Sequence, residues 1–532
     1  MTSPTEQPIK SEELVSLDPA TGEEVGRVRK TTPEEVRAAV ERAREAFDIW
    51  KRTPFAERAR IVMRAREAIL DDIDAISLLI SREMGKPVAE AFSMDIAPSL
   101  DKMQYFARKA EKLLKPRRRG IGFMALLGRS SKITYKPLGV VGIISPWNFP
   151  LSIPLGEAVM ALMAGNTVVL KPSEVTPLVG ERIGEIFETA RLPKNVLQVI
   201  SGDGETGAAL VAAGVDKIMF TGSVATGRKI AKEAAESLTP AVLELGGKDP
   251  MIVFADANLE RAAEAAVWGA FANAGQACSS AERVFVEESA AERFTRLVVE
   301  RAKRLRVGVG ADPDIDIGAM SSQRQKEIVA EHVREFEEEG AEVLTGGNAK
   351  ELEGLYYPPT VISGAKNSMK AMQEETFGPT LPIATFKTET EAIEFANDSD
   401  FGLTASVWTG NNSKGKRVAG RIVAGTVMIN EVLYTHGIPQ TPWGGFKKSG
   451  YGRTHAEEGL KQLVAVQHIH INRMAFIPDI WWFPYSKKAV DTFREMSRKY
   501  ASGSLFRLVT FVPNLVSRLL EMRKGSSKKN GS

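Results

Sequence analysis

The stretch GVVGIISPWNFPLSIPLGEAVMALMAGNTVVLKPSE, residues 139–174, decides the fold class because it joins two apolar strands through one helix. GVVGIIS and TVVLKPSE have the length and composition of buried parallel strands, and PLGEAVMALMAG between them has the length of a helix. The same alternation continues over residues 136–256. It predicts an α/β protein with a Rossmann-like, doubly wound parallel sheet.

Polar side chains stand where three of these strands end. Asn148 follows the first strand, Lys171 ends the second, and Gly222 follows the strand KIMF. Open parallel sheets bind ligands outside the carboxyl ends of their strands. We therefore expect these residues to face one ligand site of nucleotide type.

A candidate phosphate loop, Thr221-Gly-Ser-Val-Ala-Thr-Gly227, follows the strand KIMF. Gly222 and Gly227 lie five apart, so the general G-x-G-x-x-G fingerprint is not met. Ser223 can cap the following helix, whose free N–H groups and dipole favour a phosphate. The alternative is a plain turn between a strand and a helix.

A cation and a carboxylate follow the second strand in Lys171-Pro-Ser173-Glu174. Such groups can donate to and accept from ribose hydroxyls. A carboxylate at this place would repel a 2′-phosphate, so Glu174 favours NAD over NADP, with NADP possible. The alternative is an exposed ion pair without function.

The single cysteine, Cys278, lies in FANAGQACSSAERVFV, residues 271–286, among small residues that leave room for a substrate. A thiol with an ordinary pKa near about 8.5 needs help to react at neutral pH. Glu244, in VLELGGKDP, stands among apolar residues where burial raises a carboxyl pKa into the range of a general base. A buried cysteine that acts only as a small hydrophobe is the alternative.

Three separated motifs together resemble the aldehyde dehydrogenase superfamily: Pro-Trp-Asn-Phe-Pro, Glu-Leu-Gly-Gly-Lys and Gly-Gln-Ala-Cys, in this order. The resemblance covers about residues 15–470. It implies oxidation of an aldehyde to the acid through a thioester on Cys278, with Asn148 stabilising the oxyanion and Glu244 activating water. It also implies that the loop at Gly222, Ser223 and Gly227 faces the pyrophosphate of NAD.

The same resemblance extends to other cofactor contacts. Glu375-Thr-Phe-Gly-Pro matches a motif in which the acid contacts the nicotinamide ribose and Phe377 packs nearby, although its Gly-Pro also suits a structural turn. Trp147 is expected beside the cofactor, and Lys171, Ser173 and Glu174 near the adenosine ribose.

Two other activities remain open on the same scaffold. A CoA-acylating relative would pass the acyl group to CoA, and relatives of that type tend to lack the acid equivalent to Glu244. A thiol esterase would leave Lys171 and Glu375 unexplained. The substrate is not identified by the sequence, but no charge pattern selects a carboxylated aldehyde, so we prefer an apolar or aromatic one.

The motifs and the resemblance suggest how the domains divide. We expect an NAD-binding domain at 1–114 and 134–246, with packing helices over 34–114, and a second α/β domain, catalytic, at 247–442. An oligomerisation element is expected at 115–133 and 443–470, because relatives assemble through these segments, as homodimers or homotetramers. A tail, 471–532, lies beyond the resemblance.

Composition narrows the partners. The net charge of +3 gives no reason to expect nucleic acid, and the five histidines suggest no metal site. One cysteine and a polar start without a signal peptide favour an intracellular, cytoplasmic protein. The tail carries 12 Lys and Arg against 4 Asp and Glu, with many aromatic residues. We expect it to pack on a neighbouring subunit; a membrane surface is the second possibility.

Overall fold

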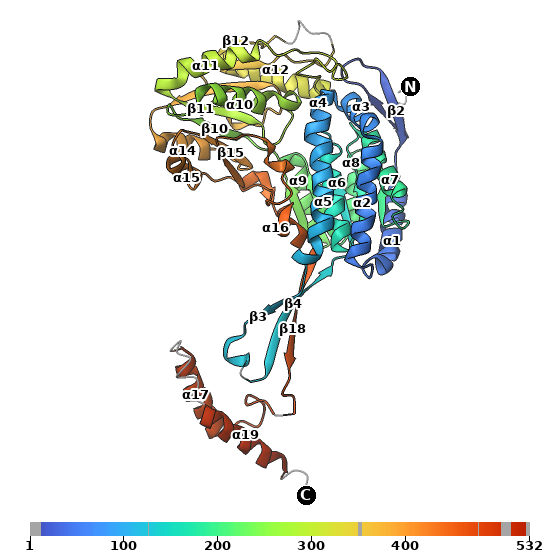
Figure 1. The fold of residues 1–532 in the computed structure, drawn as a ribbon, viewed down its shortest axis with the longest axis vertical. Coiled ribbons are helices and arrows are strands. Elements are labelled where there is room, and N and C mark those ends of the chain that lie inside the picture. The colour runs from blue at the N-terminus through green and yellow to red at the C-terminus, as the bar shows by residue number, and fades with distance from the viewer. Residues whose placement is uncertain (1–11, 126, 349–353, 477, 502–511, 528–532) are drawn as a thin grey trace, which may run out of the picture. The chain divides into compact units, whose positions relative to one another are not determined.

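The computed structural model describes residues 12–125, 127–348, 354–476, 478–501 and 512–527 (Figure 1). The chain forms two compact units. The first contains residues 1–113 and 137–465, and the second contains residues 114–136 and 466–532.

The first unit contains a six-stranded sheet of order β17-β9-β8-β5-β6-β7. All neighbours are parallel except β17 and β9. Chain order reverses beside β5, since β6 and β7 follow on one side and β8 and β9 on the other. The strands are β5 (Val140–Ile144), β6 (Thr167–Lys171), β7 (Leu197–Val199), β8 (Lys217–Thr221), β9 (Ala241–Glu244) and β17 (Gly450–Tyr451). The predicted doubly wound sheet is confirmed.

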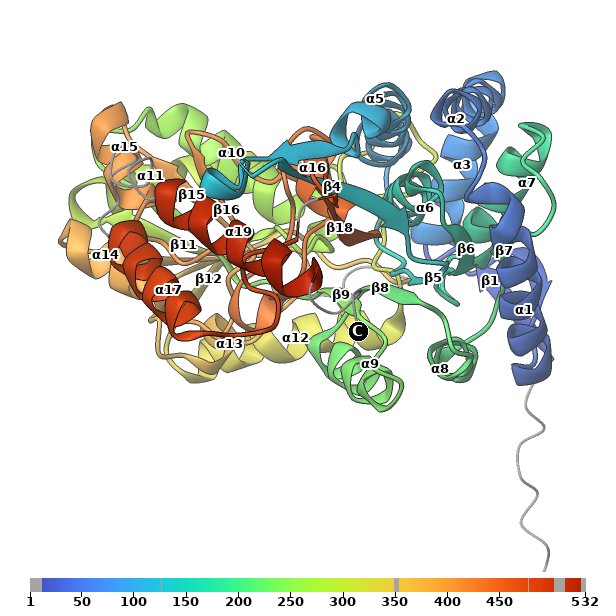
Figure 2. The same ribbon diagram turned by 90° about the horizontal axis from the view of Figure 1, so that it is seen from below.

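Helices cover both faces of this sheet (Figure 2). One face shares a core with α1 (Pro33–Trp50), α8 (Gly204–Ala212) and α9 (Val224–Glu236). The other is covered by α6 (Ser152–Ala164) and α7 (Pro177–Thr189). The α6 helix is buried along its whole length, which explains its almost uninterrupted apolar sequence.

The helical N-terminal region predicted at 34–114 is confirmed. It comprises α1, α2 (Phe55–Asp71), α3 (Ile73–Met84), α4 (Val88–Glu90), a π-helical segment at Ala91–Ile96, and α5 (Ala97–Leu113). The α3 helix ends at Gly85, whose φ of +80° suits a glycine C-cap. A two-stranded sheet, β1 (Glu13–Leu17) with β2 (Glu24–Arg29), precedes these helices.

A second sheet in the same unit has the order β12-β13-β14-β11-β10-β15-β16 and is parallel except between β12 and β13. Its residues form the largest hydrophobic cluster described. Its strands are β10 (Asp249–Val253), β11 (Ala281–Glu287), β12 (Glu342–Thr345), β13 (Thr360–Ser363), β14 (Thr380–Phe386), β15 (Thr404–Trp408) and β16 (Thr426–Ile429). Its helices are α10 (Leu259–Phe271), α11 (Glu288–Ala302), α12 (Gln323–Glu338), α13 (Lys370–Gln373), α14 (Glu389–Asn397) and α15 (Asn412–Ala419). The helix α16 (Ala456–Lys461) packs against α6.

The connection between β9 of the first sheet and β10 of the second is short, residues 245–248. The carboxyl end of β9 therefore lies near the amino ends of the second sheet's strands. Glu244 ends β9, whereas Cys278 and Glu375 belong to the loops that enter β11 and β14. The reactive candidates converge here because of this short connection.

The second unit contains a three-stranded sheet of order β18-β4-β3, in which β3 (Arg117–Arg119) and β4 (Arg129–Pro137) are antiparallel. The long strand β18 (Val464–Asn472) enters the unit, and the helices α17 (Lys487–Ala501) and α19 (Val512–Ser527) follow it. Two parts of the tail, 502–511 and 528–532, lie outside the described residues.

Candidate active site

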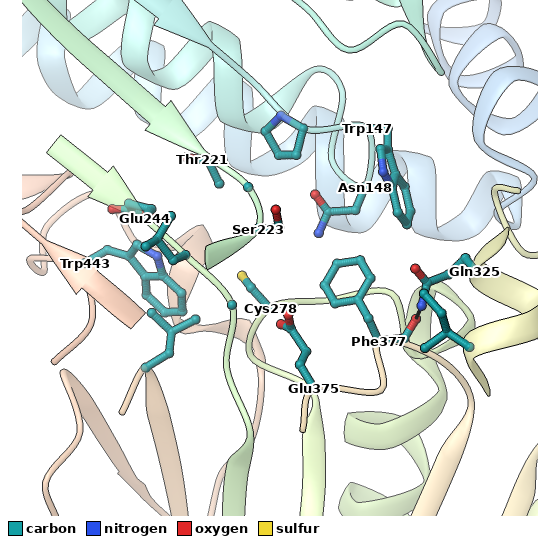
Figure 3. Close-up of a pocket in the computed structure, with 16 residues that line it drawn as sticks. Trp147, Asn148, Thr221, Ser223, Glu244, Cys278, Gln325, Glu375, Phe377 and Trp443 are labelled. Carbon is teal, nitrogen blue, oxygen red and sulfur yellow. Dashed lines mark hydrogen bonds between the residues drawn. The ribbon is translucent and has the colours of Figure 1, made fainter. Parts of the chain in front are cut away.

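A cavity of about 290 Å³ lies between the two sheets of the first unit (Figure 3). Eight of the residues predicted from the sequence line it: Trp147, Asn148, Gly222, Ser223, Glu244, Cys278, Glu375 and Phe377. They come from the ends of β5, β8 and β9 and from the loops before β11 and β14. The cavity opens at the carboxyl ends of β5 and β8, where the strand order reverses and open α/β sheets bind ligands.

Four predicted contacts do not line this cavity. Lys171 is buried at the end of β6, and its Nζ donates to Glu174 Oε2 at 3.0 Å. Glu174 is about half exposed, and Ser173 Oγ accepts a hydrogen bond from the N–H of Val175. Gly227 lies in α9, where an added Cβ would come within 2.6 Å of Leu245. Gly227 thus allows α9 to pack closely against Leu245, and it does not line the cavity.

The lining suits a nicotinamide cofactor. Ser223 is the N-cap of α9, and its Oγ accepts a hydrogen bond from the N–H of Thr226. The remaining N–H groups of the first turn provide a site for phosphate. Trp147 and Phe377 meet edge to face with their centroids 5.5 Å apart, and together they give this part of the cavity an apolar, aromatic lining.

Cys278 follows a backbone turn that L-amino acids rarely adopt. Asn273 and Ala274 have φ values of +55° and +53°, and Gly275 follows at +72°. Both carboxylate oxygens of Glu90 accept a hydrogen bond from the N–H of Asn273. An added Cβ on Gly275 would come within 2.2 Å of the carbonyl oxygen of Gly378, so only glycine fits there. Strain of this kind persists only where the surroundings hold it in place.

The thiol itself is half-buried and sits in an acidic environment. Burial raises the pKa of Cys278, and the carboxylates of Glu244, Asp249 and Glu375 raise it further. The resting thiol is therefore protonated at neutral pH. It needs a base before it can act as a nucleophile.

Asn148 is fixed beside Cys278 by hydrogen bonds on its side chain and its backbone (Figure 3). Its Nδ2 donates to the carbonyl oxygen of Gln276 at 3.1 Å. Its own carbonyl oxygen accepts from Lys86 Nζ at 2.7 Å and from Asn273 Nδ2 at 3.0 Å. An amide nitrogen carries two hydrogens, so one remains to stabilise negative charge in the cavity.

Glu244 has the properties of a base that works near neutrality. It is buried, and its Oε1 accepts a hydrogen bond from Thr454 Oγ1 at 2.8 Å. Burial raises the pKa of Glu244 to about 7, against the opposing effects of the Thr454 hydrogen bond and the Lys102 ammonium. A carboxylate of this basicity can take a proton from water or from a thiol.

Sequence reasoning missed a buried ion pair that holds the loop containing Glu375 and Phe377. Lys248 Nζ contacts Glu282 Oε2 at 2.8 Å, and both side chains are almost fully buried. Glu282 also accepts from the N–H groups of Thr376, at 2.8 Å, and Phe377, at 2.9 Å. The available signal was an acid and a base, Glu282-Arg283, inside the apolar strand at 281–287.

A second cavity of about 130 Å³ meets the first at Cys278. Its lining is mainly apolar or aromatic: Met94, Pro98, Phe149, Ile153, Trp268, Leu433 and Tyr434, with Ser93, Ser279, His436 and Gly437. None of these described lining residues is Lys, Arg, Asp or Glu, and burial lowers the pKa of His436 well below its ordinary value. An aldehyde can therefore reach the sulfur through an uncharged passage.

The sequence profile of the aldehyde dehydrogenase family matches residues 7–469. This chain belongs to the aldehyde dehydrogenase family. The 4,4'-diapolycopene aldehyde oxidase of Methylomonas sp is 37% identical to it over 485 residues, which is 90% of each chain.

Solved aldehyde dehydrogenases share the fold. The NAD-dependent aldehyde dehydrogenase of Sinorhizobium meliloti has a TM-score of 0.84 and 37% identity, over 88% of this chain and 93% of that one. The indole-3-acetaldehyde dehydrogenase of P. syringae, solved with NAD+ and IAA, has a TM-score of 0.83 and 34% identity, over 87% and 93%. The comparisons confirm the predicted fold class, the enzyme class and the use of a nicotinamide cofactor by this aldehyde dehydrogenase.

Proposed function

We propose that this aldehyde dehydrogenase oxidises an apolar aldehyde to its carboxylic acid, with Cys278 as nucleophile, Asn148 as oxyanion donor and Glu244 as base. The observation that carries the proposal is the meeting of two cavities at Cys278. One cavity fits the cofactor and the other is an uncharged substrate passage.

The steps follow from the positions of these groups. Glu244 removes the proton of Cys278, and the thiolate attacks the carbonyl carbon. Asn148 Nδ2 and a backbone N–H stabilise the oxyanion, each by about 3 to 4 kcal/mol in comparable sites. A nicotinamide held beside Trp147 and Phe377 would supply the acceptor for a hydride, and loss of that hydride from the adduct leaves a thioester on Cys278. Glu244 passes the proton of the thiol to solvent and can then take a proton from water, whose oxygen attacks the thioester. The acid is released, and the Cys278 sulfur regains a proton.

The substrate class is inferred from the second cavity. Trp268, Phe149 and Leu433 offer apolar contact, and the described lining provides no cation for a carboxylated aldehyde. Its small volume means that a long substrate places only its aldehyde end there. A lipid-soluble or aromatic aldehyde fits these properties, and the relative from Methylomonas sp, a diapolycopene aldehyde oxidase, supports this choice.

A panel of aldehydes tests the proposal through NADH absorbance. Straight-chain aldehydes of increasing length and an aromatic aldehyde are compared with succinate semialdehyde, each with and without CoA. We expect kcat/KM to rise with chain length, to be lowest for the semialdehyde and to be indifferent to CoA. Preference for the semialdehyde would refute the substrate class, and a CoA requirement would refute hydrolysis.

NAD is proposed as the preferred cofactor because Glu174 lies beside Lys171 at the end of β6, where its charge would repel a 2′-phosphate. Glu174→Gln should narrow the preference for NAD over NADP in kcat/KM. Glu188→Gln, on an exposed part of α7, is the control. Equal use of both cofactors by the unaltered enzyme would contradict this role.

The finer organisation also remains a proposal. We assign 1–114 and 134–246 to cofactor binding, 247–442 to catalysis, and 115–133 with 443–470 to assembly as a homodimer or homotetramer. An intracellular, cytoplasmic location is proposed from the single cysteine. Mass measurement of the native assembly checks the oligomeric state.

A further inference from the structure

The second unit has a charge opposite to that of the rest of the chain. Residues 114–136 and 466–532 carry 19 Lys and Arg against 4 Asp and Glu, a formal charge of +15. With a total of +3, the remaining residues carry −12. The segment 114–136 contributes seven of these cations and no acid. This concentration of charge emerges only when the fold joins the two segments.

The same unit exposes four aromatic side chains close together in sequence. Phe476 is 76% exposed, Trp482 54%, Phe483 78% and Tyr485 58%. The rings of Phe483 and Tyr485 are 4.7 Å apart. Exposed aliphatic residues accompany them on the two helices: Val490, Val516 and Leu520. Apolar groups of this size and number are unusual on a surface without a partner.

The loop that presents these aromatic residues is held from behind by one buried arginine. Arg518, on α19, is almost fully buried and donates to the carbonyl oxygens of Ile480, Trp482 and Pro484. On the same loop, Ile480 packs against Leu515 of α19. The loop is therefore held in a defined conformation. Its residue Ile480 is buried against Leu515, whereas the four aromatic side chains remain exposed.

Cations flank this loop. The guanidinium of Arg129 is buried, lies 5.0 Å from the Trp481 ring and pairs with Asp479, so it holds the loop and does not face outward. Lys487 and Lys488 are exposed at the start of α17, directly after the aromatic residues. Exposed Trp, Tyr and Phe beside Lys and Arg are typical of proteins that rest at a lipid headgroup layer.

We propose that the second unit docks the enzyme on an anionic lipid membrane, with Phe476, Trp482, Phe483 and Tyr485 inserted at the headgroup level and the cations facing the lipid charge. Among the described residues we find no helix that combines the length and the apolar character needed to span a membrane. Nucleic acid is a less suitable partner. It could bind the cations and stack on the aromatic rings, but it would leave the exposed aliphatic residues Val490, Val516 and Leu520 without a contact. The proposal is independent of the proposed function, because it concerns residues outside both cavities.

The test is sedimentation of the full-length enzyme with vesicles. Phosphatidylcholine vesicles with phosphatidylglycerol are compared with phosphatidylcholine alone, without aldehyde or cofactor. The apolar variant combines F476S, W482S, F483S and Y485S, and the charge variant combines K487E and K488E. The control for the apolar variant combines I49S and L238S, which replace two exposed apolar residues of the first unit. The control for the charge variant combines K387E and K416E, which replace two exposed lysines of the same unit.

We expect the unaltered enzyme to bind the anionic vesicles, and added salt to weaken binding. The apolar and charge variants should each lose about tenfold or more in partitioning, whereas both controls bind normally. Turnover of a short water-soluble aldehyde and the native mass should not change. Three results would overturn the proposal: no binding by the unaltered enzyme, a changed native mass in the apolar variant, which marks a subunit interface, or binding of an oligonucleotide instead of vesicles.

Discussion

At the scale of single residues, burial gives Cys278 and Glu244 complementary acid–base properties. The pKa of the thiol is raised, so Cys278 keeps its proton at rest, while the pKa of Glu244 is raised to about 7, so it can accept one. Lys102 holds the pKa of Glu244 below the value that burial alone would give. The resting thiol is therefore protonated, and Glu244 is basic enough to accept a proton near neutral pH.

The steady-state rate should therefore depend on the ionisation of Glu244. Below about pH 7 the carboxyl is protonated and cannot accept a proton, so kcat should rise as the pH increases through about 7. Lys102→Met removes the nearby cation, which should move the inflection to higher pH. The measurement is kcat against pH for both proteins. If the inflection stays at the same pH in the variant, the Lys102 ammonium does not lower the pKa of Glu244.

At the scale of elements, the loop before β14 depends on an ion pair from two other strands. Lys248 precedes β10 and donates to Thr376 Oγ1, whereas Glu282, on β11, accepts from the N–H groups of Thr376 and Phe377. Phe377 itself has a φ of +52°, so its backbone needs this support. The ion pair thus positions Glu375 and Phe377 in the cavity without lining it.

Glu282→Gln should loosen this loop. The change leaves a buried ammonium without its counter-ion, which typically costs about 3 to 5 kcal/mol. We expect a lower Tm and a raised KM for NAD, with a smaller change in KM for the aldehyde. Thermal unfolding and initial rates check this, with the exposed Glu288→Gln as control. An unchanged KM for NAD would show that the ion pair of Lys248 and Glu282 does not position the loop for the cofactor.

The elements were predictable where one local signal decides them. Apolar runs predicted the strands of the first sheet, and Ser223 predicted a helix start. Long-range pairs were not predictable, because Lys248 and Glu282 are 34 residues apart and neither shows a local pattern. The left-handed turn at Asn273 and Ala274 also gave no signal, since neither residue type requires it.

At the scale of the whole molecule, several carboxyl groups are buried where nearby hydrogen bonds and cations do not fully offset the cost of burying a negative charge. Burial raises the pKa of Glu83 and Glu90 to about 7, and that of Glu157 and Asp249 to about 8. The folded state then binds more protons than the unfolded state between about pH 4.5 and pH 8. The free energy of unfolding must fall as the pH rises through that window.

Tm should accordingly decrease between pH 5.5 and pH 8. Glu157→Gln should flatten this dependence, because the amide is neutral at every pH and Glu157 Oε2 has no hydrogen-bond partner in the described structure. Thermal unfolding at a fixed scan rate provides the curve, with the exposed Glu188→Gln as control. A Tm that rises across the window would contradict the burial argument. Lys102 and Lys217, whose pKa values are lowered to about 8, act mainly above it.

The central claim is that Cys278 carries the acyl group and that Glu244 releases it. The most direct measurement is the mass of Glu244→Gln after prolonged reaction with a short aldehyde and NAD, so that solvent can slowly take the proton of Cys278 in place of Glu244, followed by peptide mapping. We predict that the peptide containing Cys278 gains the mass of the aldehyde less two hydrogens, as a thioester requires, and that Cys278→Ala gains nothing. NADH formation by Glu244→Gln without an adduct at Cys278, or an adduct on any other residue, would contradict the account.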